Sequence, residues 1–112
     1  MDLLWELCKD DVLISRNEFE QKFEGWIVDP HPKGVRVSKG AEFHFVLKPD
    51  QQITRADIRW CVAPIIEQFG YAETTTPTHD VRQHRFNKIL GFREVARDAD
   101  FVRFRIERMK HV

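Results

Sequence analysis

The first 25 residues carry two short apolar patterns, each bounded by polar residues. Three leucines recur at helical spacing within residues 2–9, beside a tryptophan, which fits either a short helix or an N-terminal strand. Ser15, followed three residues later by Glu18, forms the capping-box pattern that opens a helix. We expect that helix to run through about Phe23, because Gly25 is a suitable stop just beyond it.

Three strands are predicted between residues 26 and 47. Residues 26–28, W-I-V, and 35–37, V-R-V, are short strands by this pattern, and the D-P-H-P-K-G sequence between them is typical of a turn. Residues 41–47 alternate in the manner of a half-buried strand. The three strands therefore follow one another as a meander. In the third strand, one face carries Phe43, Phe45 and Leu47, and the other carries Glu42, His44 and Val46.

The second half of the chain alternates helices and strands. Thr54, with Asp57 three residues later, marks a helix start, and the apolar residues that follow fall on one stripe. A run of threonines favours a strand after that helix. Asp80 can cap the next helix, and Gly91 can end it. The predicted elements are a helix from Thr54 to Gly70, a strand over 72–78, a helix from Asp80 to Gly91, and a hairpin of strands 93–97 and 101–108.

This order of elements predicts the α+β class. We expect a mixed, mostly antiparallel sheet with flanking helices and a central β-α-β unit, in which strands 41–47 and 72–78 are adjacent and parallel. The length fits one domain spanning residues 1–112. The side chains expected to be mostly buried are Phe43, Phe45, Ile58, Val62, Ile65, Phe69, Phe86, Ile89 and Leu90.

Charge and composition limit the classes of partner that we expect for the chain. Eighteen basic residues balance eighteen acidic ones, so no global field draws the chain to a nucleic acid or an anionic membrane. The sequence has no long apolar run and no leader, so we expect no membrane partner and a cytoplasmic location. Cys8 and Cys61 lie among apolar neighbours, which predicts buried free thiols.

The C-terminal third is the most basic part of the chain. From Arg82 onward the sequence has nine basic residues and four acidic ones. We expect Arg103 and Arg105 to project from one face of the last strand. That face is either solvated or a surface for an acidic partner.

Two segments resemble the GNAT acyltransferase family. Residues 80–92, DVRQHRFNKILGF, are similar to the family segment N-x-x-A-x-x-x-Y-x-x-L-G-F, in which Leu90, Gly91 and Phe92 match. Residues 51–56, QQITRA, align with its phosphate loop, (R/Q)-x-x-G-x-(G/A). The resemblance implies that the two central parallel strands splay apart and that acetyl-CoA or CoA lies along them. The cofactor-binding residues it implies are Leu47, Gln51, Gln52, Ile53, Thr54, Arg55 and Ala56.

The chain departs from the family pattern at two positions. Thr54 stands in place of the central glycine, where a β-branched side chain crowds a helix start that should face phosphates. Asn87 stands in place of the family's tyrosine general acid, and an amide has no proton to give to a leaving thiolate. Glu42 and His44 are the candidates for a base. The histidines lack metal-ligand spacing, so we expect no metal site.

Two functions follow from these observations. The departures favour a GNAT-fold protein with a degenerate acyl-CoA site, which acts as a non-catalytic binding or assembly protein. The sequence is also similar to small GNAT-like proteins of phages and prophages, including head-assembly proteins. That similarity implies phage structural proteins as partners and a bacterial or phage-infected cell, or a virion, as the location. The alternative, favoured by Gln51 and Ala56, is an active acetyl-CoA-dependent N-acetyltransferase. GNAT proteins often dimerise, which implies a homodimer.

Overall fold

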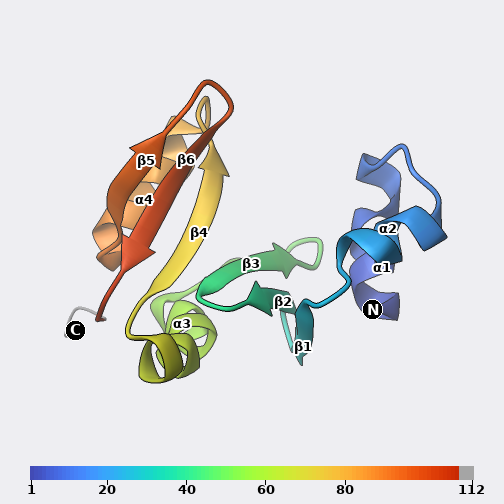
Figure 1. Cartoon of the computed structure of the whole chain (residues 1–112), viewed down its shortest axis with the longest axis horizontal. Helices are drawn as coiled ribbons and strands as arrows, with labels where there is room; N and C mark the ends of the chain where they lie inside the picture. Colours follow the sequence, from blue (N-terminus) through green and yellow to red (C-terminus); the bar gives the residue numbers. More distant parts are fainter. Residues whose placement is uncertain (109–112) are drawn as a thin grey trace.

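The computed structural model describes residues 1–108 and has the predicted α+β class (Figure 1). The helices and strands follow in the predicted order, and the first segment is a helix rather than a strand. The elements are α1 (Asp2–Cys8), the short 3₁₀ helix η1 (Lys9–Asp11), α2 (Arg16–Lys22), β1 (Ile27–His31), β2 (Gly34–Lys39), β3 (Glu42–Leu47), α3 (Arg55–Phe69), β4 (Ala72–Pro77), α4 (Val81–Leu90), β5 (Arg93–Arg97) and β6 (Phe101–Ile106).

The six strands form one mixed sheet in the order β1-β2-β3-β4-β6-β5. Neighbours pair antiparallel except β3 and β4, which are parallel and are connected by α3. A single residue pair, Glu42 opposite Glu73, is in register between them, and the Glu73 amide donates to the Ala41 carbonyl at 2.8 Å. Beyond this pair the two strands diverge (Figure 1). The predicted adjacency, direction and splay of these strands are therefore confirmed.

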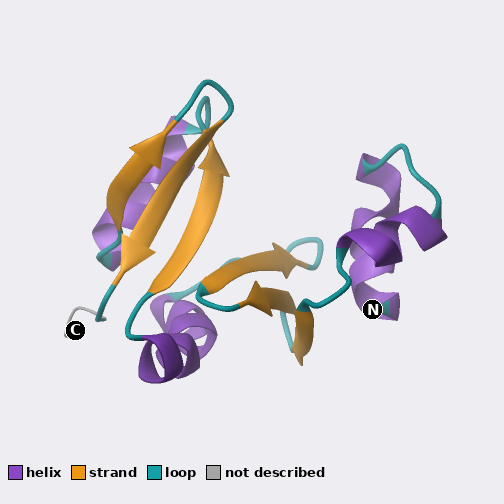
Figure 2. Ribbon diagram, in the orientation of Figure 1, coloured by secondary structure: helices purple, strands orange, loops and turns teal. Residues whose placement is uncertain are grey.

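Figure 2 shows α1 and α2 on one side of the molecule and α3 and α4 on the other. The packing accordingly forms two hydrophobic clusters. Helices α1 and α2 pack on β1–β3 through Leu4, Phe19, Val35 and Val37. Helices α3 and α4 pack with β4 and β6 around Phe104 and its buried neighbours. Because side chains alternate along a strand, β3 contributes to both clusters from its opposite faces. None of the helices within residues 1–108 is long and apolar enough to cross a membrane.

The predicted core is correct for Phe43, Ile58, Val62, Ile65 and Leu90, which are buried. It is wrong for Ile89 and Phe69, which are exposed. On α4 the inward face is formed by His84, Asn87 and Leu90, so Ile89 points outward and is 57% exposed. Phe69, in the last turn of α3, is 43% exposed. Phe45 and Phe86 are half-buried because they line the space that opens between the diverging strands.

The helix caps are those that the sequence predicts. The Ser15 hydroxyl accepts the Glu18 amide at 3.2 Å, and the Asp80 carboxylate accepts the Gln83 amide at 3.1 Å. Gly70 and Gly91 end α3 and α4 in the left-handed conformation. These local signals therefore set the ends of the helices.

One predicted turn is partly wrong. Residues 29–31 continue strand β1, and only residues 32–33 turn. Pro30 is tolerated because β1 is an edge strand, where a missing amide hydrogen breaks no outer pairing. The predicted strand positions 26, 41, 78, 107 and 108 lie just outside the observed strands.

Arg36 on β2 ties the sheet to α3 at the proline of that helix. Pro64 has no amide hydrogen, so the Trp60 carbonyl loses its helical partner. The Arg36 Nη1 atom donates to the Cys61 carbonyl at 2.9 Å and lies 3.5 Å from the Trp60 carbonyl. Its Nη2 atom donates to Asp29 at 2.6 Å, and the guanidinium stacks on the Trp60 ring at 4.9 Å. Arg36 on β2 thus offers a hydrogen-bond donor to the Trp60 carbonyl, for which Pro64 provides none within the helix.

Candidate functional site: the cleft between the splayed strands

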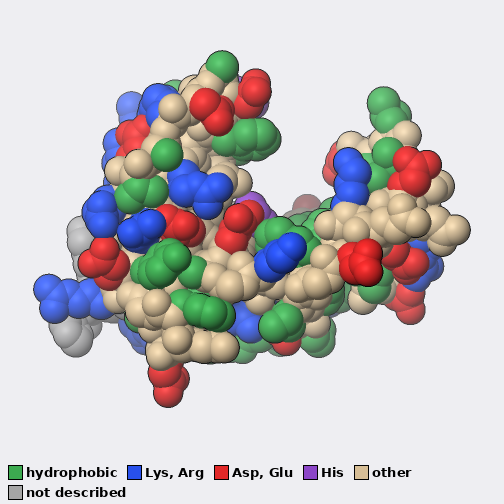
Figure 3. Space-filling model, in the orientation of Figure 1, with side chains coloured by type: hydrophobic (Ala, Val, Ile, Leu, Met, Phe, Trp, Pro, Cys, Tyr) green, Lys and Arg blue, Asp and Glu red, His purple; other side chains and the backbone are tan. Residues whose placement is uncertain are grey.

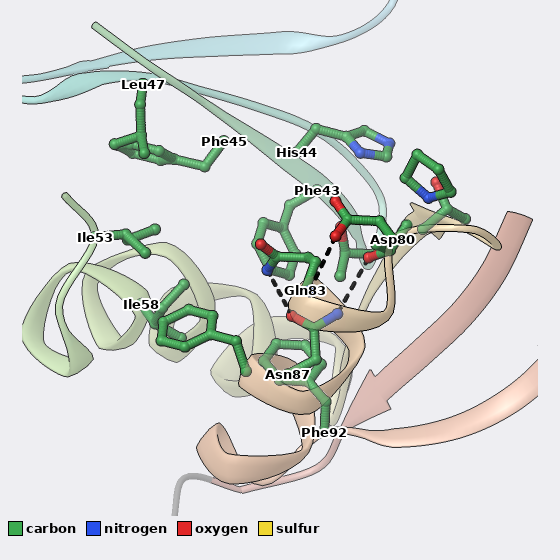
Figure 4. Close-up of a pocket in the computed structure, with 15 residues that line it drawn as sticks. Phe43, His44, Phe45, Leu47, Ile53, Ile58, Asp80, Gln83, Asn87 and Phe92 are labelled. Atoms are coloured by element: carbon green, nitrogen blue, oxygen red, sulfur yellow. Dashed lines mark hydrogen bonds between the residues drawn. The ribbon is translucent and has the colours of Figure 1, made fainter. Parts of the chain in front are cut away.

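A cleft of about 240 Å³ opens where β3 and β4 diverge (Figure 4). The β3 wall is apolar, with Phe43, Phe45 and Leu47 side by side. The β4 wall is polar, since residues 74–76 are threonines. Helix α3 closes one side through Ile58, and α4 closes another through Gln83, Phe86 and Asn87. The site therefore has an apolar wall and a polar wall.

Asn87, the residue in place of the family tyrosine, lies on this inward face of α4 and is only 4% exposed. Its Nδ2 atom donates to the Thr76 hydroxyl at 3.1 Å, and its Oδ1 atom accepts from Gln83 Nε2 at 3.0 Å (Figure 4). The amide therefore fastens α4 to β4. It supplies no proton for acid catalysis in this position.

Hydrogen bonds and an ion pair centred on Asp57 fix the loop before α3. The Thr54 amide donates to Asp57 Oδ2 at 2.8 Å, and the Asp57 amide donates back to the Thr54 hydroxyl at 3.3 Å. The Lys33 ammonium reaches the same Asp57 oxygen at 2.7 Å and also donates to the Gln52 carbonyl at 3.1 Å. The Asp57 side chain is 10% exposed, and the hydrogen bonds from Lys33 and Thr54 lower its pKa to about 2. A carboxylate therefore occupies the first turn of the helix that would face a phosphate.

The residues predicted to bind a cofactor are only partly brought together. Leu47 and Ile53 line the cleft. The other five lie on the exposed loop and first turn of α3 and do not line it: Gln51, Gln52, Thr54, Arg55 and Ala56. Asp57, which the sequence identifies only as a capping residue, is the central polar group of this region. No sequence signal pairs it with Lys33, because the two lie 24 residues apart on different elements.

The candidate bases Glu42 and His44 lie on the face of β3 that points away from Phe43 and Phe45. His44 Nε2 lies 2.9 Å from Glu42 Oε2. The other Glu42 oxygen lies 3.8 Å from Arg103 Nη1. Of the two, His44 lines the cleft and Glu42 does not.

Arg103 and Arg105 project from one face of β6, as the alternation predicts. Glu73 binds Arg105 Nε at 2.8 Å and lies 3.6 Å from Arg103 Nη1. Arg105 also stacks on the Tyr71 ring at 4.5 Å. Figure 3 shows the molecular surface hollowed between the β4–β6 strands and helices α1–α2, with acidic and basic side chains along its floor. These two arginines are therefore ion-paired within the chain rather than free.

His31 is a half-buried polar residue near the loop. Its Nδ1 atom accepts the Lys33 amide at 3.0 Å, so the proton of the neutral ring lies on Nε2, which is 3.7 Å from Asp57 Oδ1. The ring packs edge-on against Trp60 at 4.7 Å. His31 therefore helps to fix the turn that carries Lys33.

Both cysteines of the chain are free thiols. Cys61 is a buried free thiol, as predicted, and burial raises its pKa to about 12. Cys8 is half-buried rather than buried. No group of three or more His, Cys, Asp or Glu side chains in the described part of the chain could hold a metal ion.

The fold is similar to that of a solved GNAT structure, described as apo FdhC, a nucleotide-linked sugar GNAT. The TM-score is 0.50 at 13% sequence identity, and the match covers 82% of this chain. It spans 63% of the length of that protein. At this identity the likeness shows a GNAT-like fold and nothing of the chemistry. No protein-family model matches the sequence, and no curated protein matches it.

Proposed function

We propose that this chain is a GNAT-fold binding protein with a degenerate acyl-CoA site, which holds protein partners and does not transfer acetyl groups. The observation that carries the proposal is the hydrogen bond from the Thr54 amide to Asp57. In the phosphate loop that the sequence resembles, amides at the start of the helix bind a pyrophosphate. In this chain the Thr54 amide already donates to Asp57. The negative charge of the Asp57 carboxylate also repels a phosphate.

The state of Asn87 supports the same function. Departure of the thiolate of CoA is helped by a proton donor, which typically contributes about 10²–10⁴-fold to the rate. Both functional atoms of the Asn87 amide already have partners within the chain. Loss of the donor slows transfer, and loss of the phosphate contacts weakens cofactor binding, so the two changes act together.

The similarity to small phage and prophage GNAT-like proteins suggests the kind of partner. We propose that the partners are structural proteins of a phage or prophage and that the chain acts in assembly. A homodimer is compatible with this role. Co-purification of the chain from a phage-infected host with a defined structural protein, and its absence from uninfected cells, supports this part of the proposal.

Acetyl transfer is the second candidate function, and the cleft itself favours it. An apolar groove of about 240 Å³ between splayed strands can accept an acyl group and the thioester next to it. His44 borders that groove and is the predicted base, but its side chain lies on the opposite face of β3 from Phe45, with Nε2 2.9 Å from Glu42 Oε2. Transfer by this route requires CoA to bind although its phosphates would face Asp57.

Calorimetry with CoA and acetyl-CoA, followed by thiol release across a panel of amines and peptides, separates the two functions. We expect no micromolar binding and no turnover from the parent chain. Asp57→Asn and Thr54→Gly test the phosphate site, and Asn87→Tyr tests the missing acid. Gain of CoA binding by Asp57→Asn alone identifies the carboxylate as the block. Robust turnover by the parent overturns the proposed function.

A further inference from the structure

The one place where β3 and β4 pair brings two carboxylates together. Glu42 and Glu73 are register partners on these neighbouring strands, and their side chains leave the sheet on the same face. Like charges opposite each other on adjacent strands repel and destabilise the pairing. The pairing is short, because no other residues of β3 and β4 are in register within residues 1–108. The junction between the two strands therefore contains a repulsion that few backbone contacts oppose.

Arg103 on β6 reaches both carboxylates. Its Nη1 atom lies 3.6 Å from Glu73 Oε1 and 3.8 Å from Glu42 Oε1. Because β4 lies between β6 and β3, this side chain crosses β4 to reach Glu42 (Figure 1). Among residues 1–108 it forms the only ion pair that joins β6 to β3. One positive charge thus attracts both carboxylates and offsets the repulsion between them.

The other charges near the junction do not act across it. Arg105 binds Glu73 at 2.8 Å, and this pair joins only β6 and β4. His44 Nε2 lies 2.9 Å from Glu42 Oε2, and both of these residues belong to β3. Arg103 is therefore the charged residue that links the two sides of the junction.

The contacts of Arg103 depend on its charge more than on the shape of its guanidinium group. Both distances to the carboxylates are longer than a hydrogen bond. The side chains of Arg103 and Glu42 are partly exposed, so water and salt reach them. Interactions between charges of this kind weaken as the ionic strength rises.

The opposite face of the junction is apolar and fixed by packing. Phe43, next to Glu42 on β3, is buried, and its ring lies 6.2 Å from the Phe92 ring. This face opens into the cleft, since Phe43 and Phe92 line it. The β3–β4 pair is thus the closed end of the cleft, and a change in this pair changes how far the strands separate beyond it.

We propose that Arg103 is an electrostatic latch, which keeps the β3–β4 pair closed and limits how far the cleft opens. With the arginine present, its two attractions outweigh the repulsion between Glu42 and Glu73. Without it, the carboxylates repel each other and the pair opens. The latch does not depend on what the cleft binds, so it stands or fails independently of the proposed function.

Amide hydrogen exchange of the full chain, followed by NMR, tests the latch. The Glu73 amide reports on the junction because it donates to the Ala41 carbonyl across it. The Thr78 amide, which donates to the Asp100 carbonyl beyond the other end of β4, is the internal reference. We expect Arg103→Gln to raise the exchange rate of the Glu73 amide about fivefold, the upper range for a partly exposed ion pair, and to leave Thr78 unchanged. Arg103→Lys keeps the charge and should behave as the parent does.

The dependence on salt separates a latch from a merely structural arginine. In the parent, a rise from about 20 mM to about 500 mM NaCl weakens both attractions, so the Glu73 amide should exchange faster. In Arg103→Gln the force that remains between Glu42 and Glu73 is repulsive, so the same salt should slow the exchange. Glu42→Gln removes that repulsion, and Arg103→Gln should therefore have little further effect in the Glu42→Gln background.

Arg93→Gln is the matched control, because it breaks an exposed ion pair with Glu107 that does not reach β3. It should leave the exchange of the Glu73 amide unchanged. Equal exchange in the parent and Arg103→Gln, or salt effects of the same sign in both, overturns the latch. Faster exchange of both reporter amides in Arg103→Gln shows a general loss of stability and also overturns it. The salt series on the parent needs no substitution, and slower or unchanged exchange there overturns the latch.

Discussion

Replacing Asp57 by asparagine should remove a pH-dependent part of the free energy of unfolding. The carboxylate binds the Lys33 ammonium at 2.7 Å and the Thr54 amide at 2.8 Å, and its pKa falls from 3.8 to about 2. One pKa unit corresponds to about 1.4 kcal/mol, so this fall in the pKa corresponds to at most about 2.5 kcal/mol. Asparagine keeps an oxygen for the Thr54 amide and loses only the charge.

The direction of the effect follows from the lower folded-state pKa. The unfolded chain binds the proton more tightly, so the contribution of Asp57 is fully present above about pH 4. It decreases as the pH falls through 2, where the folded carboxylate also becomes protonated. We therefore expect Asp57→Asn to be less stable than the parent at pH 5 and nearly equal to it at pH 2.

Urea unfolding followed by tryptophan fluorescence, between about pH 5 and pH 2, measures this difference. Glu67→Gln is the matched control, because Glu67 is an exposed carboxylate on the same helix. The free energy of unfolding of Glu67→Gln, plotted against pH, should run parallel to that of the parent. If the Asp57→Asn curve is also parallel to the parent curve over the whole range, the ion pair contributes nothing and the reasoning is refuted.

Three further predictions concern the packing, each measured as the free energy of unfolding in urea. Ile65→Ala should cost about 2–5 kcal/mol because the side chain is buried. Phe45→Ala should cost only about 1–2 kcal/mol because the ring is partly buried and lines the cleft, and equal losses for the two variants contradict the cleft. Arg36→Ala should cost about 2 kcal/mol in the parent and about 1 kcal/mol less in a Pro64→Ala background, where the restored amide serves the freed carbonyl; additive losses refute this link. Gly34→Ala should cost about 3 kcal/mol or more, because the new Cβ atom would lie 2.0 Å from a backbone oxygen of β3. A free energy of unfolding equal to that of the parent contradicts that contact.

Local signals explain why so much of the fold could be predicted from the sequence. A cap such as Thr54 with Asp57 acts within one helical turn, so it can be recognised without knowledge of the tertiary structure. Alternation in β6 places Val102 and Phe104 inward by geometry alone. The parallel pairing of β3 and β4 follows from the β-α-β connection. These features depend on neighbours in the sequence.

The errors have the opposite origin. Phe45 has the spacing of a core residue and is only partly buried, because the strand that would cover it diverges. Ile89 has helical spacing from Phe86, but tertiary packing rotates α4 so that His84 and Asn87 point inward. The pairing of Lys33 with Asp57 joins a turn to a helix. Such contacts are set by how elements meet, and the residue pattern of one element does not contain them.

The single register pair between β3 and β4 also affects how the two halves of the molecule unfold. Leu4, Val35 and Val37 belong to one buried cluster, and Leu90, Val102 and Phe104 belong to another. With so little hydrogen bonding across the junction, loss of one cluster removes few contacts from the other, which is the condition for separate cooperative units. The parts of the sheet on either side of that pair are then two foldons, and a ligand that bridges the junction makes their unfolding cooperative.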